Sequence, residues 1–275
     1  LGGAADQPVI RREPRPIRPA RLLPRASSGP APRSLRDLAA EVGAPLLSVA
    51  RLRDAATLEA LASFAPDAIC VACFTRRLPP MLLRLPRLGC LNAHPSLLPD
   101  NRGPDPLFWT FHAGATATGV TIHLMDDAFD AGPILAQSRV ALVEGETEET
   151  LETRLAVLAG DLMASSLAGL ASGALTPTPQ DATLATAHPW PEPDDYLIPA
   201  AEWSARRAYA FACGVSGREQ PITLIAADGA RFRLREPLGY NPDDALTTPW
   251  RRDGDHLTLA CAPGVLSCRL AEDAS

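Results

Sequence analysis

The stretch that decides the fold is an uninterrupted apolar run, Ala68-Ile69-Cys70-Val71-Ala72-Cys73-Phe74. Apolar and polar residues do not alternate in it, and such a run is typical of a strand covered on both faces in a parallel sheet. Segments with helix and strand patterns alternate on either side of it: helices at 35–42, 54–64 and 82–85, and strands at 45–49 and 89–92. This alternation predicts an α/β fold with a doubly wound, mostly parallel sheet.

The chain continues with a short helix, two strands and a long helix, at 107–112, 119–125, 134–140 and 148–171. Five prolines between residues 174 and 196 are typical of a connecting segment. Beyond it the pattern predicts one helix and four short strands, at 204–213, 221–226, 230–234, 256–261 and 265–270. We therefore predict a large domain at residues 1–175, a linker at 176–196 and a small β-rich domain at 197–275.

The 275-residue chain has a net charge of −6, and its 26 basic residues are all arginine. This acidic balance argues against a protein that coats nucleic acid with its whole surface. Six arginines nevertheless form a local basic arm in a Pro-rich stretch near the start: Arg11, Arg12, Arg15, Arg18, Arg21 and Arg25. No apolar run approaches the ~20 residues that a membrane-spanning helix needs, so we predict a soluble chain that does not enter a membrane.

Two of the six cysteines, Cys70 and Cys73, have the spacing of a metal-binding or redox pair. They lie on the predicted strand 68–74, however, where positions three apart point to opposite faces. The two thiols would not converge there. We therefore predict buried core cysteines in a reducing cytosol.

The polar residues best suited to chemistry follow the predicted strand 89–92, in the segment Asn92-Ala93-His94-Pro95-Ser96-Leu97-Leu98-Pro99. Ligands of open α/β sheets bind at the carboxyl ends of the strands. Asn92 and His94 lie two positions apart and point to the same face, and an amide with an imidazole suits a reaction that develops an oxyanion. A carboxylate from the acidic loop 126–130 can reach the histidine, hold its tautomer and raise its pKa.

Other interpretations of these residues find less support. His94 alone is also compatible with a hydrogen-bonded polar residue at a strand end. Ser96 lies close to His94, but no G-x-S-x-G motif accompanies it, which disfavours a hydrolase. Metal-ligand spacings and the glycine-rich motifs that bind dinucleotides or nucleoside triphosphates do not occur either. The other histidines are scattered, at His112, His123, His188 and His256.

An ordered set of motifs between residues 90 and 140 resembles the folate-dependent formyltransferase family, and within it most closely the methionyl-tRNA formyltransferases. The motifs are Asn92-Ala93-His94-Pro95-Ser96-Leu97-Leu98-Pro99, Arg102-Gly103, Pro106-x-x-Trp109, Thr118-Gly119-Val120-Thr121-Ile122-His123 and Asp130-x-Gly132-x-Ile134. Weaker similarity extends from residue 8 to residue 171.

The resemblance implies a catalytic trio of Asn92, His94 and Asp130. In such enzymes 10-formyltetrahydrofolate donates its formyl group to an amine, and no metal takes part. The Asn92 amide and a protonated His94 would stabilise the oxyanion. Asp130 would relay the proton that the amine releases, through water or through His94.

The resemblance also implies where the two substrates bind. The folate donor would lie between the loop that follows residue 73 and the acidic loop, against Phe74, Thr75, Arg76, Leu78, Met125 and Asp126. The acceptor would contact the turn after the trio and the basic arm, at Ser96, Arg102, Gly103, Arg15 and Arg18.

Two features depart from the family pattern. Counting back from Leu78-Pro79 places Thr75 where the methionyl-tRNA enzymes have a glycine, and β-branched residues resist positive φ. The family also opens with a strand and a helix that would precede Leu1, so we expect the natural start to be missing. Both features favour one alternative, a non-catalytic homologue, and the intact trio argues against it.

The second domain bears on which amine is formylated. Glycinamide ribonucleotide formyltransferases have a single domain, so an added β-rich domain favours methionyl-tRNA or a nucleotide-linked amino sugar. Segments 196–218 and 221–234 look like a shortened β-barrel domain of the methionyl-tRNA enzymes, and the basic arm occupies the place of their tRNA-contacting loop. Residues 191–275 hold 13 acidic residues and 9 arginines, a net charge of −4 that argues against phosphate binding. We predict a cytoplasmic enzyme for initiator tRNA, with the amino-sugar enzyme as the alternative; oligomeric state is not indicated.

Overall fold

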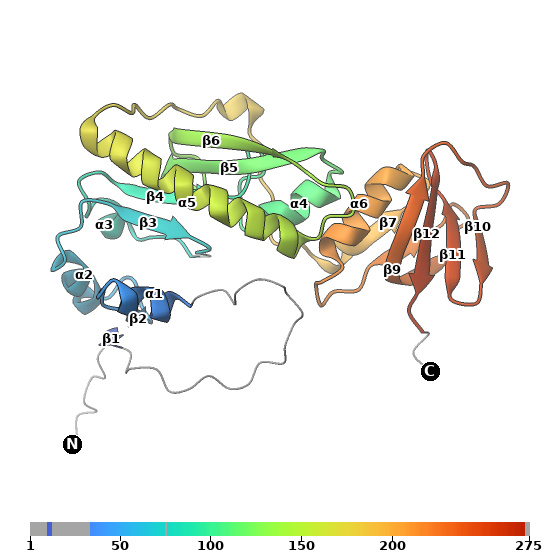
Figure 1. Cartoon of the computed structure of the whole chain (residues 1–275), viewed down its shortest axis with the longest axis horizontal. Helices are drawn as coiled ribbons and strands as arrows, with labels where there is room; N and C mark the ends of the chain where they lie inside the picture. The colour runs from blue at the N-terminus through green and yellow to red at the C-terminus, as the bar shows by residue number, and fades with distance from the viewer. Residues whose placement is uncertain (1–9, 13–33, 75, 273–275) are drawn as a thin grey trace, which may run out of the picture. The chain divides into compact units, whose positions relative to one another are not determined.

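The computed structural model describes residues 10–12, 34–74 and 76–272. The chain divides into two compact units (Figure 1). We call residues 1–67 with 78–87 the N-terminal unit, and residues 68–77 with 88–275 the main unit. The candidate chemistry lies in the main unit.

The described residues of the N-terminal unit form two short strands and three helices. The strands β1 (Ile10–Arg12) and β2 (Leu47–Val49) pair antiparallel. The helices are α1 (Leu35–Glu41), α2 (Ala55–Ala62) and α3 (Pro80–Leu83). Ser34 caps α1 in a capping box, in which its hydroxyl accepts from the Asp37 backbone N–H and the Asp37 carboxylate accepts from the Ser34 N–H.

The main unit begins with a four-stranded sheet in the order β3 (Ile69–Ala72), β4 (Cys90–His94), β5 (Ala117–Leu124) and β6 (Ile134–Ala141). β3 and β4 pair parallel, whereas β4 with β5 and β5 with β6 pair antiparallel. The α/β fold class is confirmed, but this sheet is mixed and not mostly parallel. The loop between β5 and β6 is too short for the crossover that parallel pairing requires, so the chain returns as a hairpin.

Helix α5 (Glu148–Ser172) packs along β4, β5 and β6 (Figure 1). Thr147 caps its first turn and Gly173, at φ 73°, ends it. Leu151 and Leu155 bury their side chains in the core. α5 is also long and apolar enough to span a membrane by length and composition alone, which the prediction of no such run missed. A single helix of this kind is weak evidence for a membrane span.

The prediction that Cys70 and Cys73 are core residues is wrong, because both are exposed. Among the described residues β3 is the last strand in the order of its sheet and pairs with β4 alone, and within β3 only Val71 is buried. The apolar run 68–74 is therefore not covered on both faces. Cys90, Cys213 and Cys268 are buried as expected.

The second sheet has six strands in the order β10-β11-β12-β9-β8-β7. The strands are β7 (Leu197–Pro199), β8 (Thr223–Ile225), β9 (Arg231–Asn241), β10 (Trp250–Asp253), β11 (His256–Ala260) and β12 (Val265–Leu270). Trp250 on β10 packs its ring 5.1 Å from that of Phe232 on β9 and donates from Nε1 to Asp228. These contacts bring β10 against the β8–β9 hairpin, so the sheet curls like a barrel.

Helix α4 (Pro106–His112) packs against α6 (Ala205–Val215) and joins the two sheets into one core. Arg218, which follows α6, binds the carboxylates of Asp105 before α4 and Glu148 at the start of α5. These ion pairs raise the pKa of Arg218 against the opposing effect of burial. One guanidinium thereby ties three helices together.

The predicted linker 176–196 makes regular contacts with the first sheet and its loops. Thr178 and Ile134 exchange two backbone hydrogen bonds of 2.8 Å. Further along, Ala187 forms a parallel β-bridge with Arg102. Two 3₁₀ turns lie in the same region, at Ala182–Leu184 and Pro193–Tyr196. We call residues 178–189 the strap; the domain boundaries stay a prediction.

Candidate active site

The site is built on β4, which carries both Asn92 and His94. Antiparallel pairing places Asn92 directly opposite His123 of β5, and His94 opposite Thr121. Alternation along each strand puts the four side chains on one face of the sheet. His123, which sequence reasoning placed in a family motif without giving it a role in the site, therefore lies in the site.

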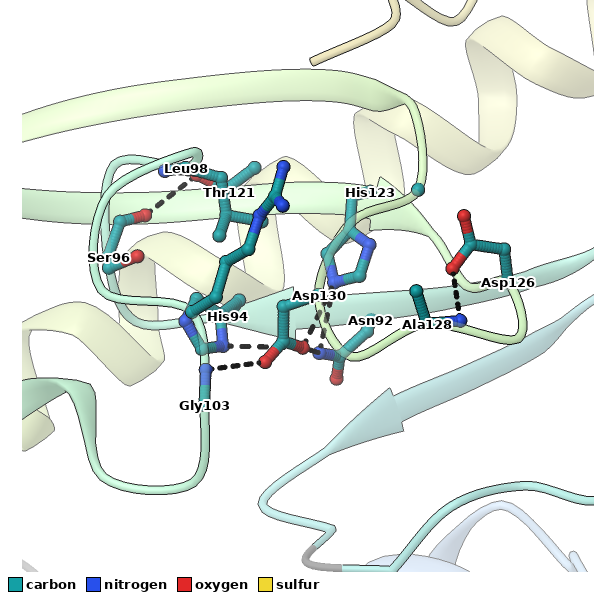
Figure 2. Close-up of polar contacts among 12 residues, drawn as sticks. Asn92, His94, Ser96, Leu98, Gly103, Thr121, His123, Asp126, Ala128 and Asp130 are labelled. Carbon is teal, nitrogen blue, oxygen red and sulfur yellow. Dashed lines mark hydrogen bonds and ion pairs between the residues drawn. The ribbon is translucent and has the colours of Figure 1, made fainter. Parts of the chain in front are cut away.

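Asp130 is the centre of the arrangement (Figure 2). Its Oδ1 lies 3.7 Å from Nδ1 of His94 and 3.6 Å from Nε2 of His123. The same oxygen lies 3.5 Å from Nδ2 of Asn92. Three residues from two strands and one from a loop thus meet within ion-pair or hydrogen-bond distance, and the predicted trio of Asn92, His94 and Asp130 comes together.

His123 fixes the orientation of the Asn92 amide. Nδ1 of His123 donates to the Leu124 carbonyl at 3.0 Å, an assignment that leaves Nε2 as an acceptor. That nitrogen accepts from Nδ2 of Asn92 at 3.2 Å. Asn92 is thereby held with its N–H groups toward Asp130, as a donor and not an acceptor.

The backbone around Asp130 is under local constraint. Asp130 has φ 50°, a left-handed conformation that costs non-glycine residues energy. Gly132 follows closely, and a Cβ at this position would lie 1.8 Å from the Leu124 carbonyl oxygen. The backbone N–H of Gly103 donates to Oδ2 of Asp130 at 2.9 Å. The carboxylate is therefore held by its own loop and by the loop after β4.

Burial is the main influence on the imidazole of His94. It lowers the pKa of His94, while Asp130 and the Asn101 carbonyl oppose that effect and His123 adds to it. Nε2 of His94 donates to the Asn101 carbonyl at 2.8 Å, which leaves Nδ1 as the free lone pair, facing Asp130. His94 is thus neutral near pH 7, which differs from the protonated ring implied by the resemblance.

Asp130 is held ionised. Burial raises its pKa, but the His123 and His94 rings, when they carry a proton, and the Gly103 N–H together outweigh burial and lower the pKa below its usual value. A neutral, buried imidazole beside an ionised carboxylate can accept a proton, and the carboxylate then stabilises the imidazolium that forms.

The turn that leaves β4 is fixed by Thr121. Its hydroxyl donates to the Ser96 carbonyl at 2.7 Å and accepts from the Leu98 N–H at 3.1 Å. Ser96 itself is buried, and its hydroxyl donates to the Asp100 carbonyl at 2.6 Å. This geometry does not support the prediction that Ser96 binds the acceptor, because its side chain is taken up within the turn.

The other residues predicted for the acceptor lie in different surroundings. Arg102 binds Gln180 of the strap through Nε and Nη2, at 3.2 and 2.7 Å. Gly103 lies beside Asp130, and a Cβ there would lie 2.1 Å from the His188 carbonyl oxygen. Arg15 and Arg18 lie outside the described residues.

Some of the residues predicted to bind the folate donor lie on an exposed surface that carries aromatic rings and arginines. The guanidinium of Arg77 lies 4.4 Å from the ring centroid of Phe129, the neighbour of Asp130, and that of Arg76 lies 5.7 Å from the ring of Phe74. Asp126 is exposed and accepts from the Ala128 N–H. Met125 is half-buried, Leu78 belongs to the N-terminal unit, and Thr75 lies outside the described residues.

Gln180 is a second residue that sequence reasoning missed. Its Nε2 donates to the carbonyls of Asp130 and Gly132, at 2.8 and 2.7 Å. No sequence signal marks it, since it stands in a Pro-rich segment far from the motifs. For His123 a signal existed in the alternation Thr121-Ile122-His123, but its use required the register of β4 on β5. Within the described part of the chain, no cluster of three or more potential metal ligands occurs.

Comparison with known proteins agrees with the family resemblance seen in the sequence motifs. The family profile described as Formyl transferase matches residues 16–167. The chain is 38% identical over 236 residues to a methionyl-tRNA formyltransferase of Myxococcus xanthus, covering 84% of this chain and 73% of that protein.

Solved structures share the fold at lower identity. Methionyl-tRNA formyltransferase from Clostridium thermocellum superimposes with a TM-score of 0.51 and 18% identity, over 66% of this chain and 77% of that one. HypX from Aquifex aeolicus in complex with tetrahydrofolic acid gives 0.52 and 18%, over 77% of this chain and 36% of that one. At these identities the likeness concerns the fold alone.

Proposed function

We propose that this chain, which belongs to the formyl transferase family, transfers a formyl group from 10-formyltetrahydrofolate to the amino group of methionyl initiator tRNA. The observation that carries the proposal is the convergence of Asn92, His94 and Asp130 in one partly buried site. An oriented amide donor, a neutral imidazole and an ionised carboxylate are the groups that acyl transfer to an amine requires.

The residues near Asp130 fit a folate. A folate combines flat aromatic rings with a carboxylate-bearing tail. The main unit offers the exposed rings of Phe129 and Phe74 for stacking, and the guanidinium groups of Arg76 and Arg77 for the carboxylates. Phe129 is the residue before Asp130, so this surface lies next to the catalytic carboxylate. When bound, the folate supplies the activated formyl carbon.

Each residue of the site then has a defined task. Asn92, oriented by His123, donates an N–H to the formyl oxygen as negative charge develops on it. Its weaker contact, 3.5 Å to Asp130, is the one that this donation replaces. Nδ1 of His94 accepts the proton that the amine loses as the new C–N bond forms. His94 afterwards returns this proton to the folate nitrogen that leaves, so the proton count is balanced.

Asp130 makes this proton transfer favourable. The imidazolium that forms on His94 lies 3.7 Å from the Asp130 carboxylate and donates through Nε2 to the Asn101 carbonyl. Both contacts stabilise the positive charge, and the surrounding burial strengthens them. Asp130 thus acts as an electrostatic partner of the histidine and stays ionised throughout.

A row of arginines supports a nucleic-acid acceptor. Along β9, Arg231, Arg233 and Arg235 alternate with Phe232 and Leu234, which pack against the core. The three arginines are exposed, and so is Arg269 on the neighbouring strand β12. Among the described residues none of the four arginines forms an ion pair. The net negative charge of the C-terminal region therefore does not prevent a basic face, to which tRNA phosphates can bind.

The direct test is formyl transfer from 10-formyltetrahydrofolate to methionyl initiator tRNA with the full-length protein, and with His94→Ala as the control. Transfer by the wild type that the variant loses supports the proposal. Transfer to a nucleotide-linked amino sugar but not to the tRNA would overturn the acceptor. Folate binding without transfer to either would overturn catalysis. Detection of the protein in the cytoplasmic fraction would agree with a role in translation initiation.

A further inference from the structure

The strap carries one side chain whose contacts converge on the catalytic carboxylate from outside the site. Gln180 uses all the hydrogen-bonding capacity of its amide in one place. Both N–H groups donate to loop carbonyls, those of Asp130 and Gly132. The amide oxygen accepts twice from the guanidinium of Arg102. With donors on one side and acceptors on the other, the amide can adopt only one orientation.

The two groups that Gln180 joins are those that place the Asp130 carboxylate. One is the loop in which Asp130 takes its left-handed conformation, at φ 50°. The other is the Arg102–Gly103 segment, whose Gly103 N–H donates to Oδ2 of Asp130. Without Gln180, the strained loop would lose the hydrogen bonds to the carbonyls of Asp130 and Gly132, and Arg102 would lose the side chain that connects it to that loop.

The strap is itself fixed at both ends around Gln180. Before it, Thr178 pairs with Ile134 through two backbone bonds. After it, the Arg102 N–H donates to the Thr186 carbonyl at 2.9 Å, and the His188 N–H donates to the Arg102 carbonyl at 2.9 Å. Trp109 stacks on His188 with the ring centroids 4.6 Å apart. Gln180 is therefore presented from a rigid segment.

We propose that Gln180 is a positioning residue for formyl transfer, which holds Asp130 at the distance from His94 that the proton transfer requires. The inference rests on the proposed function for its kinetic test. Gln180 itself contacts neither side chain of the His94–Asp130 pair, so it acts through the Asp130 backbone. A displacement of about 1 Å in a reacting group can lower a rate ~10²-fold.

The test compares Gln180→Ala and Gln180→Glu with Asp181→Ala in steady-state transfer. Gln180→Glu keeps the size of the side chain and the acceptor for Arg102, but cannot donate to the two carbonyls. Asp181→Ala is the matched control, because Asp181 is the next residue of the strap and, among the described residues, its side chain binds only Thr183. We expect kcat to fall about 10–100-fold in both Gln180 variants, with KM for the folate within about twofold, and no change in the control.

Wild-type kcat in Gln180→Glu would overturn the proposal, since the two donated bonds would then be dispensable. A loss in Asp181→Ala equal to that in the Gln180 variants would also overturn it, because the effect would belong to the strap as a whole. If Gln180→Ala fails to fold, Gln180→Glu alone decides.

A second readout separates this proposal from the proposed function. The titration of the His94 ring, followed by NMR, needs no turnover. The groups that face His94 are Asp130, His123 and the Asn101 carbonyl. Loss of Gln180 should let the Asp130 carboxylate withdraw and lower the pKa of His94, whereas an unchanged titration would overturn the proposal. A wild type that shows no transfer, together with a lowered pKa in the variant, would reject the function and keep the positioning role.

Discussion

Oδ1 of Asp130 lies 3.7 Å from Nδ1 of His94, in a site where burial leaves only 4% of His94 exposed. Burial and the Asp130 carboxylate have opposite effects on the pKa of His94, because burial disfavours the charged imidazole and the carboxylate favours it. Burial is the larger influence, and the pKa of His94 is lowered. The histidine thus rests as a base and gains its stabilising partner only after it accepts a proton.

The pH dependence of transfer follows from this balance. Because the pKa of His94 lies below the usual 6.5, the neutral ring persists into mildly acidic solution. We expect kcat/KM to fall only below pH 6.5, as His94 becomes protonated. Asp130→Asn removes the charge that raises the pKa of His94, so the acidic limb should move to lower pH while kcat also falls. A pH–rate profile of both proteins measures this, and a limb that moves to higher pH would contradict it.

Asn92 should contribute mainly to the rate and little to binding. Removal of one oxyanion donor typically lowers kcat ~10²–10³-fold. We expect a loss of this size in Asn92→Ala, with folate affinity nearly unchanged, measured by steady-state kinetics and by titration of folate binding. His123→Ala should lower kcat by a smaller factor than Asn92→Ala, because the Asn92 amide keeps its N–H groups but loses the acceptor that orients them. A variant of Asn92 that loses folate binding and keeps kcat would reject the oxyanion role.

Arg218 should matter for stability and not for chemistry. Asp105 is buried, and Arg218→Ala would leave its carboxylate and that of Glu148 without their partner. Loss of one partner of a buried pair costs 3–5 kcal/mol, and the partial exposure of Arg218 reduces this to about 2–3 kcal/mol. Urea unfolding measures the difference. Arg87→Ala, which breaks the exposed pair with Asp67, is the control and should change stability little.

The sequence predicted those features that depend on local pattern. Asn92, His94 and Asp130 stand in recognisable motifs, and the helices α1, α5 and α6 were located from caps and periodicity. The short strands β7 and β10 were missed, because three or four residues carry no periodic signal and their place depends on neighbouring strands.

Residues whose role depends on tertiary pairing were also missed. His123 enters the site through the register of β5 on β4, and Gln180 through a segment whose composition indicated only a linker. The prediction for Cys70 failed for the same reason. An apolar strand pattern does not reveal whether the strand lies at the edge of its sheet.

The arginine row on β9 should determine binding of tRNA. The test variant replaces Arg231, Arg233 and Arg235 together with Gln. We expect this triple variant to bind tRNA more weakly and with less dependence on salt. Each lost phosphate contact reduces the slope of log K against log salt concentration by ~0.7–0.9. A filter-binding series at several salt concentrations measures both effects. The control replaces three exposed arginines of the N-terminal unit, Arg51, Arg53 and Arg84, with Gln. Equal losses in the two triple variants would assign binding to net charge and not to this face.

His112 should make the fold sensitive to acid. Its ring lies among those of Phe108, Trp109, Trp203 and Phe211, and its pKa is lowered by burial and by Arg207, with Asp195 opposing them and His188 adding to the effect. In the unfolded chain His112 titrates near 6.5, so below that pH the unfolded state binds a proton that the folded state excludes, and the free energy of unfolding falls. His94 has the same sign. Urea unfolding between pH 7.5 and 5.5 should therefore show a loss of stability that becomes smaller in His112→Phe and in His94→Ala. Equal losses in the wild type and both variants would assign the acid sensitivity to other groups.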